Sequence, residues 1–458
     1  MESTNLERSI CVGQVPTPTN EYRSQRKFKR SVEASGSPVL PPLPLPATPH
    51  PFPFTGSRIL IFKQDPSVSE VGVRKIFLPA FISNGPQDAR IHSTGLPVVS
   101  KNAFGDFIQS PGTDAFDVVQ TFAVVRMTLT MAQRALASMG IANVIPWQWN
   151  SSANTLPISV FAHGLPDTMN AFYSRGDKAL KFGDFIRPGS SPVERIFTCR
   201  SLDIVAHETG HAILDSLKPG WILGGNPPQT GGLHESFGDL TAIFLTLSQL
   251  DLSEAVIAQT KANLHDKTFL SDLAEQFGLA LGRPNGLRNA DNNLKLSQAG
   301  NEVHAISQVF TGGIYDVLAD IFNFERRIAL KDDAKVLYDC GQYIYGLVLR
   351  AIIAAPTNAA TFADVVNHML TICTSDGRPL AYKNSIKNNF TVREVVTAPL
   401  EANFKDGAKL KAHIVDEKGA VQNRSTCCGT MKHDEYADVE SYLQQELKEL
   451  KKAFGKEK

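Results

Sequence analysis

Two histidines four positions apart are the side chains in this sequence best suited to bind a metal ion. His207 and His211 enclose Glu208 in the run His-Glu-Thr-Gly-His. On a helix, side chains four positions apart project from one face, one turn from each other, so both can bind the same zinc ion. Glu208 lies next to that face, where a carboxylate can take a proton from water. The alternative is a surface helix with two solvated histidines.

Two histidines leave a catalytic zinc ion one ligand short, because such sites normally take three ligands from the protein. Glu235 is the candidate third ligand, since it lies in a second apolar segment that follows a Gly- and Pro-rich loop. Asp239 lies one turn further along, where a carboxylate can accept the ring N–H of a zinc-bound histidine. A structural or vestigial zinc site is the alternative, but it would want a fourth protein ligand, and no cysteine lies near these histidines in the sequence.

Hydrophobic patterning predicts strands and one helix before the histidines and mostly helices after them, which is an α+β fold class. Short β-like runs between Gly, Asn and Pro turns predict strands at 59–63, 75–82 and 158–162. The apolar positions in 114–139 suit a long helix that is packed on both sides. Further helices are expected at 201–218, 233–250, 303–328, 333–354 and 361–374.

Composition divides the chain into four segments. Residues 1–54 form a leader that ends in eight prolines within sixteen positions, so it cannot be a helix or a central strand. We expect a disordered or polyproline leader, with an SH3-type ligand or an autoinhibitory segment as alternatives. Residues 55–220 are expected to form an N-terminal β/α part with the histidine helix, and residues 221–375 a C-terminal helical part. Residues 376–458 form an extension, and its tail has the apolar spacing of an amphipathic helix.

The charge and hydropathy of the chain exclude several classes of partner. The 458 residues include 46 basic and 46 acidic side chains, so no net charge draws the protein to nucleic acid or to an anionic membrane. The longest apolar stretches, such as 347–355, are much shorter than the roughly 20 residues of a membrane helix. The amino terminus has no apolar segment of a secretion signal, and the six cysteines show no disulfide framework. We therefore expect a cytoplasmic protein without a nucleic-acid or membrane partner.

The segments around His207 and Glu235 resemble the two zinc helices of the thermolysin-type gluzincin metallopeptidases. In this resemblance the zinc ligands are His207, His211 and Glu235. Glu208 matches the catalytic carboxylate, and Asp239 matches the residue that orients a histidine. The resemblance implies a two-lobe zincin fold, with an N-terminal mixed β/α lobe, a C-terminal all-helical lobe and the active-site cleft between them. It also implies a zinc-dependent endopeptidase with one catalytic Zn²⁺ and a peptide or protein substrate.

Three further segments extend the resemblance along the chain. The run that begins with Asn170 and Ala171 is similar to the edge strand with which these enzymes hold a peptide, so both residues are expected to bind substrate. The segment 302–307 resembles the one that carries the histidine of the transition state, which implies this role for His304. The segment around Arg288 resembles that of the arginine that binds a substrate carbonyl, which implies a catalytic contribution from this side chain.

The resemblance also carries an expected specificity and an expected metal requirement. Ile204 and Leu287 match positions that line the pocket after the cleaved bond, which implies a preference for a bulky apolar residue there; the alternative is that both are ordinary core residues. Asp203 matches a position that helps to bind calcium in these enzymes, but the sequence shows no acidic cluster to complete such a site. Calcium dependence is therefore doubtful.

Two other functions stay open on the sequence alone. An aminopeptidase-like or narrowly self-processing gluzincin would need an acidic anchor for a free amino terminus, and the sequence assigns none. A non-catalytic binding scaffold that retains zinc is the second alternative. It is weakened because Glu208, the candidate general base, is intact.

Overall fold

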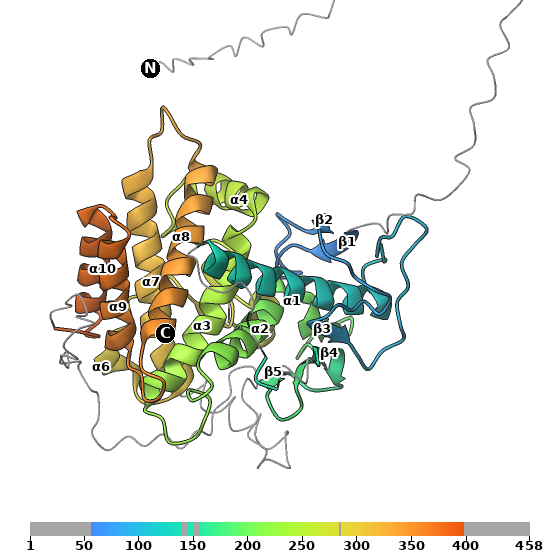
Figure 1. Cartoon of the computed structure of the whole chain (residues 1–458). Helices are drawn as coiled ribbons and strands as arrows, with labels where there is room; N and C mark the ends of the chain where they lie inside the picture. Colours follow the sequence, from blue (N-terminus) through green and yellow to red (C-terminus); the bar gives the residue numbers. More distant parts are fainter. Residues whose placement is uncertain (1–55, 139–144, 146, 150–155, 284, 398–458) are drawn as a thin grey trace, which may run out of the picture. The chain divides into compact units, whose positions relative to one another are not determined.

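The computed structural model describes residues 56–138, 145, 147–149, 156–283 and 285–397 (Figure 1). The Pro-rich leader and the amphipathic tail expected from the sequence lie outside the described residues. The elements below all belong to one unit of the chain, Phe54–Lys458.

The strands of the described residues form three small sheets. One is an antiparallel hairpin of β1 (Ser57–Phe62) and β2 (Val73–Leu78). The largest has the order β3-β4-β6-β5, with β7 also paired to β6. Its strands are β3 (Ile91–Ser93), β4 (Ile158–Leu165), β5 (Ala171–Ser174), β6 (Ala179–Ile186) and β7 (Arg195–Phe197). The third sheet pairs β8 (Asp272–Leu273) with β9 (Arg288–Asn289), which fixes Arg288 opposite Leu273.

The long helix α1 (Asp114–Ala137) begins where the sequence provides a cap. The side chain of Thr113 accepts the backbone N–H of Phe116, and acidic residues in the first turn favour the helix dipole. The helix is long and apolar enough to span a membrane by length and composition, but 83% of its most apolar window is buried inside the fold. It is therefore a core helix packed on both sides, as the sequence predicts.

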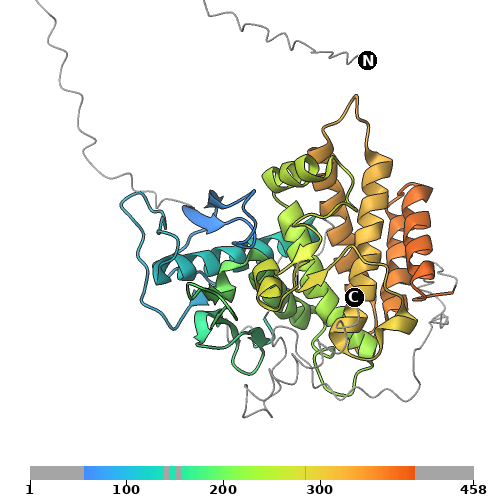
Figure 2. The same ribbon diagram turned by 180° about the vertical axis from the view of Figure 1, so that it is seen from behind.

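A short 3₁₀ turn at Thr198–Arg200 leads into the helical part of the chain. The helices are α2 (Leu202–Leu217), α3 (Pro228–Leu247), α4 (Leu250–Thr260), α5 (Glu275–Ala280), α6 (Leu296–Ala299), α7 (Val303–Glu325), α8 (Asp333–Ala354), α9 (Phe362–Ser375) and α10 (Leu380–Val392). Figures 1 and 2 show α7, α8, α9 and α10 side by side at one end and the strands β1 to β5 at the other, with α2 and α3 between them.

The two central helices are buried nearly all round. Every residue of α2 from Leu202 to Ser216 is buried, as is every residue of α3 from Gln229 to Leu247. Helices that are enclosed on all sides lie in the core of a protein, so their polar side chains must find partners inside it. This burial places the predicted metal-binding residues in a rigid, water-poor environment.

The α+β fold class is confirmed by the presence of both sheets and helices, and the division into two lobes stays a prediction. Several helix bounds differ from those expected, and the largest differences are at α3 and after residue 375. The helix α3 begins at Pro228, because proline suits the first turn of a helix. The helical part also continues beyond residue 375, since Tyr382, Ile386 and Phe390 of α10 are buried at helical spacing, and Phe390 packs 5.3 Å from the ring of Phe310 on α7.

Candidate metal centre

The helix α2 places His207 and His211 one turn apart with their rings directed to the same point. Their Nε2 atoms lie 2.8 Å from each other, and neither side chain is more than 4% exposed. Two glycines allow α2 and α3 to approach closely enough to share this point. A Cβ at Gly210 would lie 3.1 Å from the Cα of Gly238, and a Cβ at Gly238 would lie 2.7 Å from the ring of His207.

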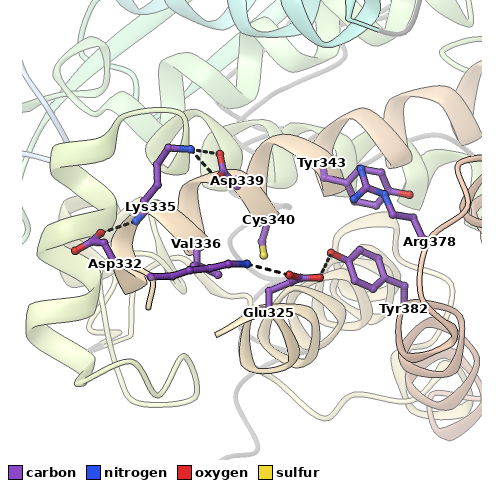
Figure 3. A pocket seen from close by; sticks show the side chains of 10 residues that line it. Glu325, Asp332, Lys335, Val336, Asp339, Cys340, Tyr343, Arg378 and Tyr382 are labelled. Carbon is purple, nitrogen blue, oxygen red and sulfur yellow. Dashed lines mark hydrogen bonds and ion pairs between the residues drawn. The ribbon is translucent and has the colours of Figure 1, made fainter. Parts of the chain in front are cut away.

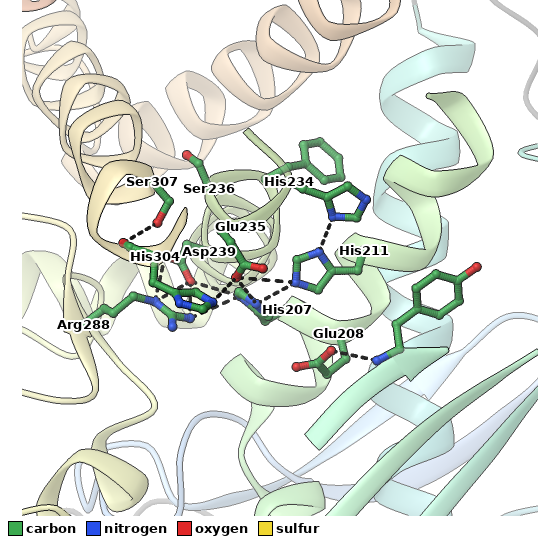
Figure 4. Close-up of polar contacts among 12 residues, drawn as sticks. His207, Glu208, His211, His234, Glu235, Ser236, Asp239, Arg288, His304 and Ser307 are labelled. Carbon is green, nitrogen blue, oxygen red and sulfur yellow. Dashed lines mark hydrogen bonds and ion pairs between the residues drawn. The ribbon is translucent and has the colours of Figure 1, made fainter. Parts of the chain in front are cut away.

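The helix α3 brings Glu235, the third ligand that the sequence predicts, close to these two histidines. Glu235 Oε2 lies 3.6 Å from His207 Nε2 and 3.9 Å from His211 Nε2. One ligand atom from each of these three residues lies within 4.8 Å of the others. Figure 4 shows the three side chains converging from the two helices.

Two features of the ligand group fit a zinc ion: the types of its ligand atoms, and a carboxylate without a hydrogen-bond partner among the described residues. Two imidazole nitrogens and one carboxylate oxygen form a common zinc set with one position left for water or substrate. Both carboxylate oxygens of Glu235 are buried without a hydrogen-bond partner among the described residues. A buried carboxylate in that condition is costly unless a cation balances it. The group therefore suits a cation held between His207, His211 and Glu235.

His207 is held from behind by a buried ion pair. Its Nδ1 lies 2.9 Å from Asp239 Oδ1, and Arg288 donates from Nε and Nη2 to the same carboxylate at 2.9 and 2.6 Å. Burial raises the pKa of Asp239, but the charge of Arg288 and the contact with His207 outweigh it, so the pKa lies below its ordinary value. Burial lowers the pKa of His207, but hydrogen bonds to Asp239 and Glu235 outweigh it and raise the pKa. Arg288 thus contacts Asp239, on the side of His207 away from the other ligands.

His211 is held from behind by another histidine. Its Nδ1 lies 2.6 Å from the Nδ1 of His234, which precedes Glu235 on α3. Burial, together with the charge of His207 and other nearby groups, lowers the pKa of His211 well below its ordinary value. Burial also lowers the pKa of His234 to about 3. Both rings are therefore neutral in this environment.

His304 lies beside the ligand group at the start of α7. Its Nε2 is 3.6 Å from Glu235 Oε2, and its Nδ1 is 2.5 Å from Glu302 Oε1. Glu302 is also the N-cap of α7, where its carboxylate accepts the backbone N–H groups of His304 and Ala305. Burial raises the pKa of Glu302, but the charge of His304 and these hydrogen bonds lower it to about 2. This carboxylate fixes the ring of His304 with Nε2 toward Glu235.

Glu208 is directed to the strand that is expected to hold the peptide. Its Oε2 accepts the backbone N–H of Tyr173 at 3.1 Å, and Figure 4 shows its carboxylate beside this strand. β5 is the last strand of its sheet. The carbonyl of Asn170 accepts Gly183 N–H from β6, and side-chain Oδ1 of Asn170 accepts the N–H of Ala171. Backbone groups alternate along a strand, so those of Ala171 and Tyr173 point away from β6.

The cavity described beside the metal ligands is narrow. It has a volume of about 10 Å³ and is lined by Asp203, Ile204, His207, Asp239, Ala242, Leu273, Ala274 and Arg288. That is close to the smallest space that holds one water molecule. Ile204 lines this cavity and Leu287 is buried without lining it, and the role expected for both beside the cleaved bond stays a prediction. A bulky apolar side chain would need these residues to move apart, so this preference stays a prediction.

Carboxylates gather near Asp203, although the sequence shows no acidic cluster there. Burial raises the pKa of Asp203 well above its ordinary value, and the negative charges of Asp65 and Glu275 add to the rise. Burial also raises the pKa of Asp65. Acidic residues from distant parts of the chain thus accompany Asp203, which the sequence alone does not reveal. These carboxylates are not among the described groups whose ligand atoms lie close enough to hold one metal ion, so calcium remains doubtful.

The structure thus brings six of the expected site residues together and adds two that the sequence analysis does not single out. The six are His207, His211, Glu235, Asp239, Arg288 and His304. His234 and Glu302 each orient a histidine of the site. A signal for both is present in the sequence, because His234 directly precedes Glu235 and Glu302 lies two positions before His304. Asp65 has no such signal, since it is 138 positions from Asp203 in the sequence.

A larger cavity lies away from the metal ligands, between α8 and the start of α10 (Figure 3). It has a volume of about 500 Å³ and is lined by Glu325, Lys331, Asp332, Lys335, Val336, Asp339, Cys340, Tyr343, Arg378 and Tyr382. Burial raises the pKa of Cys340 to about 12, so this cysteine is a thiol at neutral pH. The cavity therefore presents no thiolate for nucleophilic catalysis.

No protein-family model matches the chain, and a comparison with curated proteins gives no match either. Among solved structures, one similar chain is the precursor of protealysin, a metalloproteinase from Serratia proteamaculans. The sequence identity is 16% and the TM-score is 0.41, over 66% of this chain and 85% of that chain. This likeness is too low to assign a fold family or an activity, so the function of this chain rests on the arrangement of its own residues.

Proposed function

We propose that the chain is a zinc-dependent endopeptidase. The observation that supports this most is the convergence of Nε2 of His207, Nε2 of His211 and Oε2 of Glu235 at one buried point. When bound there, zinc supplies a Lewis acid that polarises a peptide carbonyl and lowers the pKa of a bound water to about 7. This ligand set belongs to hydrolytic zinc sites more than to closed structural ones, because it leaves a position open.

Glu208 is proposed to take the proton of the attacking water and to give it to the leaving amine. Its carboxylate is buried between α2 and β5, and the N–H of Tyr173 holds its Oε2 in place. A general base of this kind contributes about 10²- to 10⁴-fold to a rate. Its position next to the outer edge of β5 puts it beside the place where a peptide would pair with this strand.

The backbone of Ala171 and the side chain of Asn170 are proposed to bind that peptide. Ala171 presents its N–H and C=O on the outer edge of β5, where an added strand can pair with them. In the present structure the N–H of Ala171 is covered by Oδ1 of Asn170. A substrate carbonyl would therefore have to replace the Asn170 side chain at this N–H.

His304 is proposed to stabilise the oxygen that gains negative charge during the reaction. The Glu302 carboxylate, 2.5 Å from its Nδ1, favours the charged imidazole, which has a proton on both nitrogens and can donate from Nε2. Arg288 is proposed to hold Asp239 against His207, because its guanidinium contacts that carboxylate twice. Its contact with a substrate carbonyl stays a prediction from the resemblance.

One observation favours a second function, a scaffold that binds zinc without catalysis. The three ligand side chains are almost fully buried, since none of them is more than 4% exposed. A site without room for a peptide would bind the metal and cleave nothing. An activity measurement on the zinc-loaded chain separates this function from the peptidase.

The test compares the zinc-loaded chain with Glu208→Gln and with Glu254→Gln, the same change on the exposed face of α4. Zinc content and cleavage of casein and of quenched peptides, with free and blocked ends, are measured for all three. The proposal expects one zinc in each protein and cleavage by the wild type and Glu254→Gln, with about 10²- to 10⁴-fold less by Glu208→Gln. Cleavage only of peptides with free ends would indicate an exopeptidase. Bound zinc without cleavage by any of them would establish the scaffold instead.

A further inference from the structure

His234 is a buried polar residue at the metal centre to which the proposed mechanism assigns no part. Its side chain is fully buried on α3, and its Nδ1 lies 2.6 Å from Nδ1 of His211 (Figure 4). The two rings are inclined by only 21°, with centroids 4.8 Å apart. Two nearly coplanar rings that meet through nitrogen atoms have the geometry of an in-plane hydrogen bond rather than of face-to-face stacking.

The hydrogen bond between these rings decides which nitrogen of His211 carries its proton. One proton must lie between the two Nδ1 atoms, because two bare lone pairs or two N–H groups at this distance repel each other. His211 binds a metal through Nε2 only if its own proton is on Nδ1. The Nδ1–H of His211 must then donate to His234, whose proton is on Nε2.

Burial of His234 in this arrangement has an energetic cost. Its Nε2 is buried without a hydrogen-bond partner among the described residues. Leaving a buried N–H unpaired costs about 1–3 kcal/mol. The cost has a clear reason if the ring serves to direct the lone pair of His211.

We propose that His234 is a positioning residue that fixes the tautomer and the ring orientation of His211 for metal binding. This inference rests on the proposed zinc site and deepens it. The two histidine ligands then have unlike supports, since His207 is backed by the charged pair of Asp239 and Arg288 and His211 by a neutral imidazole. Groups that orient a ligand histidine in this way typically contribute 10- to 100-fold to metal affinity, to order of magnitude.

The test uses two substitutions that differ in whether they keep an acceptor. In His234→Asn the side-chain oxygen is bonded to Cγ, as Nδ1 of histidine is, so an acceptor stays close to its original place. In His234→Leu the apolar volume is kept and the acceptor is lost. Zinc affinity is measured by chelator competition, and the coordination geometry by the visible spectrum of the Co²⁺-loaded protein. Neither readout requires turnover.

The proposal expects zinc affinity to fall by about 10- to 100-fold in His234→Leu and to stay within about 3-fold of wild type in His234→Asn. The Co²⁺ spectrum should change in the leucine variant and match wild type in the asparagine variant. The thermal stability of metal-free His234→Leu should stay close to that of wild type, because the change removes the unpaired Nε2–H of His234 but leaves the Nδ1–H of His211 unpaired in its place. If His234 had only a structural role, His234→Leu would instead lower the thermal stability and leave the zinc affinity of the folded protein unchanged.

A matched control is Thr230→Val on the same helix. Thr230 is fully buried and donates to the carbonyl of Ala360, away from His211. We expect this change to lower stability without altering zinc affinity. Wild-type affinity in His234→Leu would overturn the role of His234 while the zinc site stands. Failure of the wild type to bind zinc would instead overturn the proposed function, so the two failures are distinguishable.

Discussion

Charged side chains lie both at the metal centre and in the cavity between α8 and α10, but the two regions differ in how their carboxylates are paired. In the cavity, opposite charges pair with each other: Lys335 lies 2.6 Å from Asp339, and Lys331 lies 3.6 Å from Glu325. At the metal centre, the Glu235 carboxylate faces histidine nitrogens and has no hydrogen-bond partner among the described residues. The cavity is far larger, at about 500 Å³ against about 10 Å³. The candidate metal centre is therefore distinguished by converging groups that lack an internal partner, and not by the size of its cavity.

The contrast between the two regions depends most on whether the carboxylate of Glu235 binds the metal. We expect Glu235→Gln to weaken zinc binding by more than about 100-fold, since it removes a ligand and not only its support. Equilibrium dialysis or chelator competition measures this effect. The cavity offers the matched control, Glu325→Gln, which makes the same change in a carboxylate that is already paired and should leave zinc affinity unchanged. Equal zinc affinities in these two variants would contradict the assignment.

A smaller effect is expected from the carboxylate behind His207. Asp239→Asn should lower zinc affinity by about 10- to 100-fold, because it weakens the acceptor for the Nδ1–H of His207. The change also leaves Arg288 buried without its anion, which should lower the free energy of unfolding by about 3–5 kcal/mol. Urea unfolding of the metal-free variant measures the second effect. Unchanged stability would show that the ion pair is not formed in solution.

The carboxylates around Asp203 show a third arrangement, in which like charges meet without a metal ligand set. Burial raises the pKa of Glu275 to about 7, and the charges of Asp65, Asp272 and Glu70 add to the rise. Because this folded pKa exceeds the unfolded value of about 4.5, the favourable contribution is complete below pH 4.5 and is lost as pH rises through 7.

We therefore expect the free energy of unfolding to fall between pH 5 and pH 8 by on the order of 2 kcal/mol from Glu275. Glu275→Gln should flatten this pH dependence, because its side chain does not ionise. Denaturant unfolding at a series of pH values checks both expectations. A slope that is identical in the two proteins would show that the carboxyl is ionised throughout. Added calcium should leave the unfolding curves unchanged if this cluster binds no ion.

The smallest effects are expected in the large cavity. Cys340 is buried and remains a thiol, so Cys340→Ala should lower the free energy of unfolding by only about 1 kcal/mol. Zinc content and peptide cleavage should equal those of the wild type. A loss of cleavage with unchanged stability would show that this cavity takes part in function, and the contrast with the metal centre would then fail.

Much of the candidate site can be predicted from the sequence because its members lie at helical spacing. His207 and His211 are one turn apart, as are Glu235 and Asp239, so two short patterns define both faces. The hydrogen bond between His211 and His234 could not be predicted in this way, because it depends on the relative rotation of α2 and α3. That rotation is set by close packing at Gly210 and Gly238, which spacing alone does not reveal.

The helices of the fold also divide into those that the sequence predicts and those that it does not. Apolar periodicity predicts α1, and the predicted helix at 333–354 coincides with α8, because both depend on local interactions. The last helix, α10, was not predicted, since its mean apolar content is low and only its buried face contacts α7 and α9.

The sequence by itself determined that His207 and His211 share one helix face with Glu208 beside it, and that Glu235 and Asp239 share another. Helical geometry converts the spacing of residues directly into a shared face. Only the tertiary structure decided which groups stand behind those residues. Arg288 reaches Asp239 through the pairing of β9 with β8, and Asp65 approaches Asp203 across 138 positions of sequence. Such contacts arise from the packing of distant segments, and no local pattern encodes them.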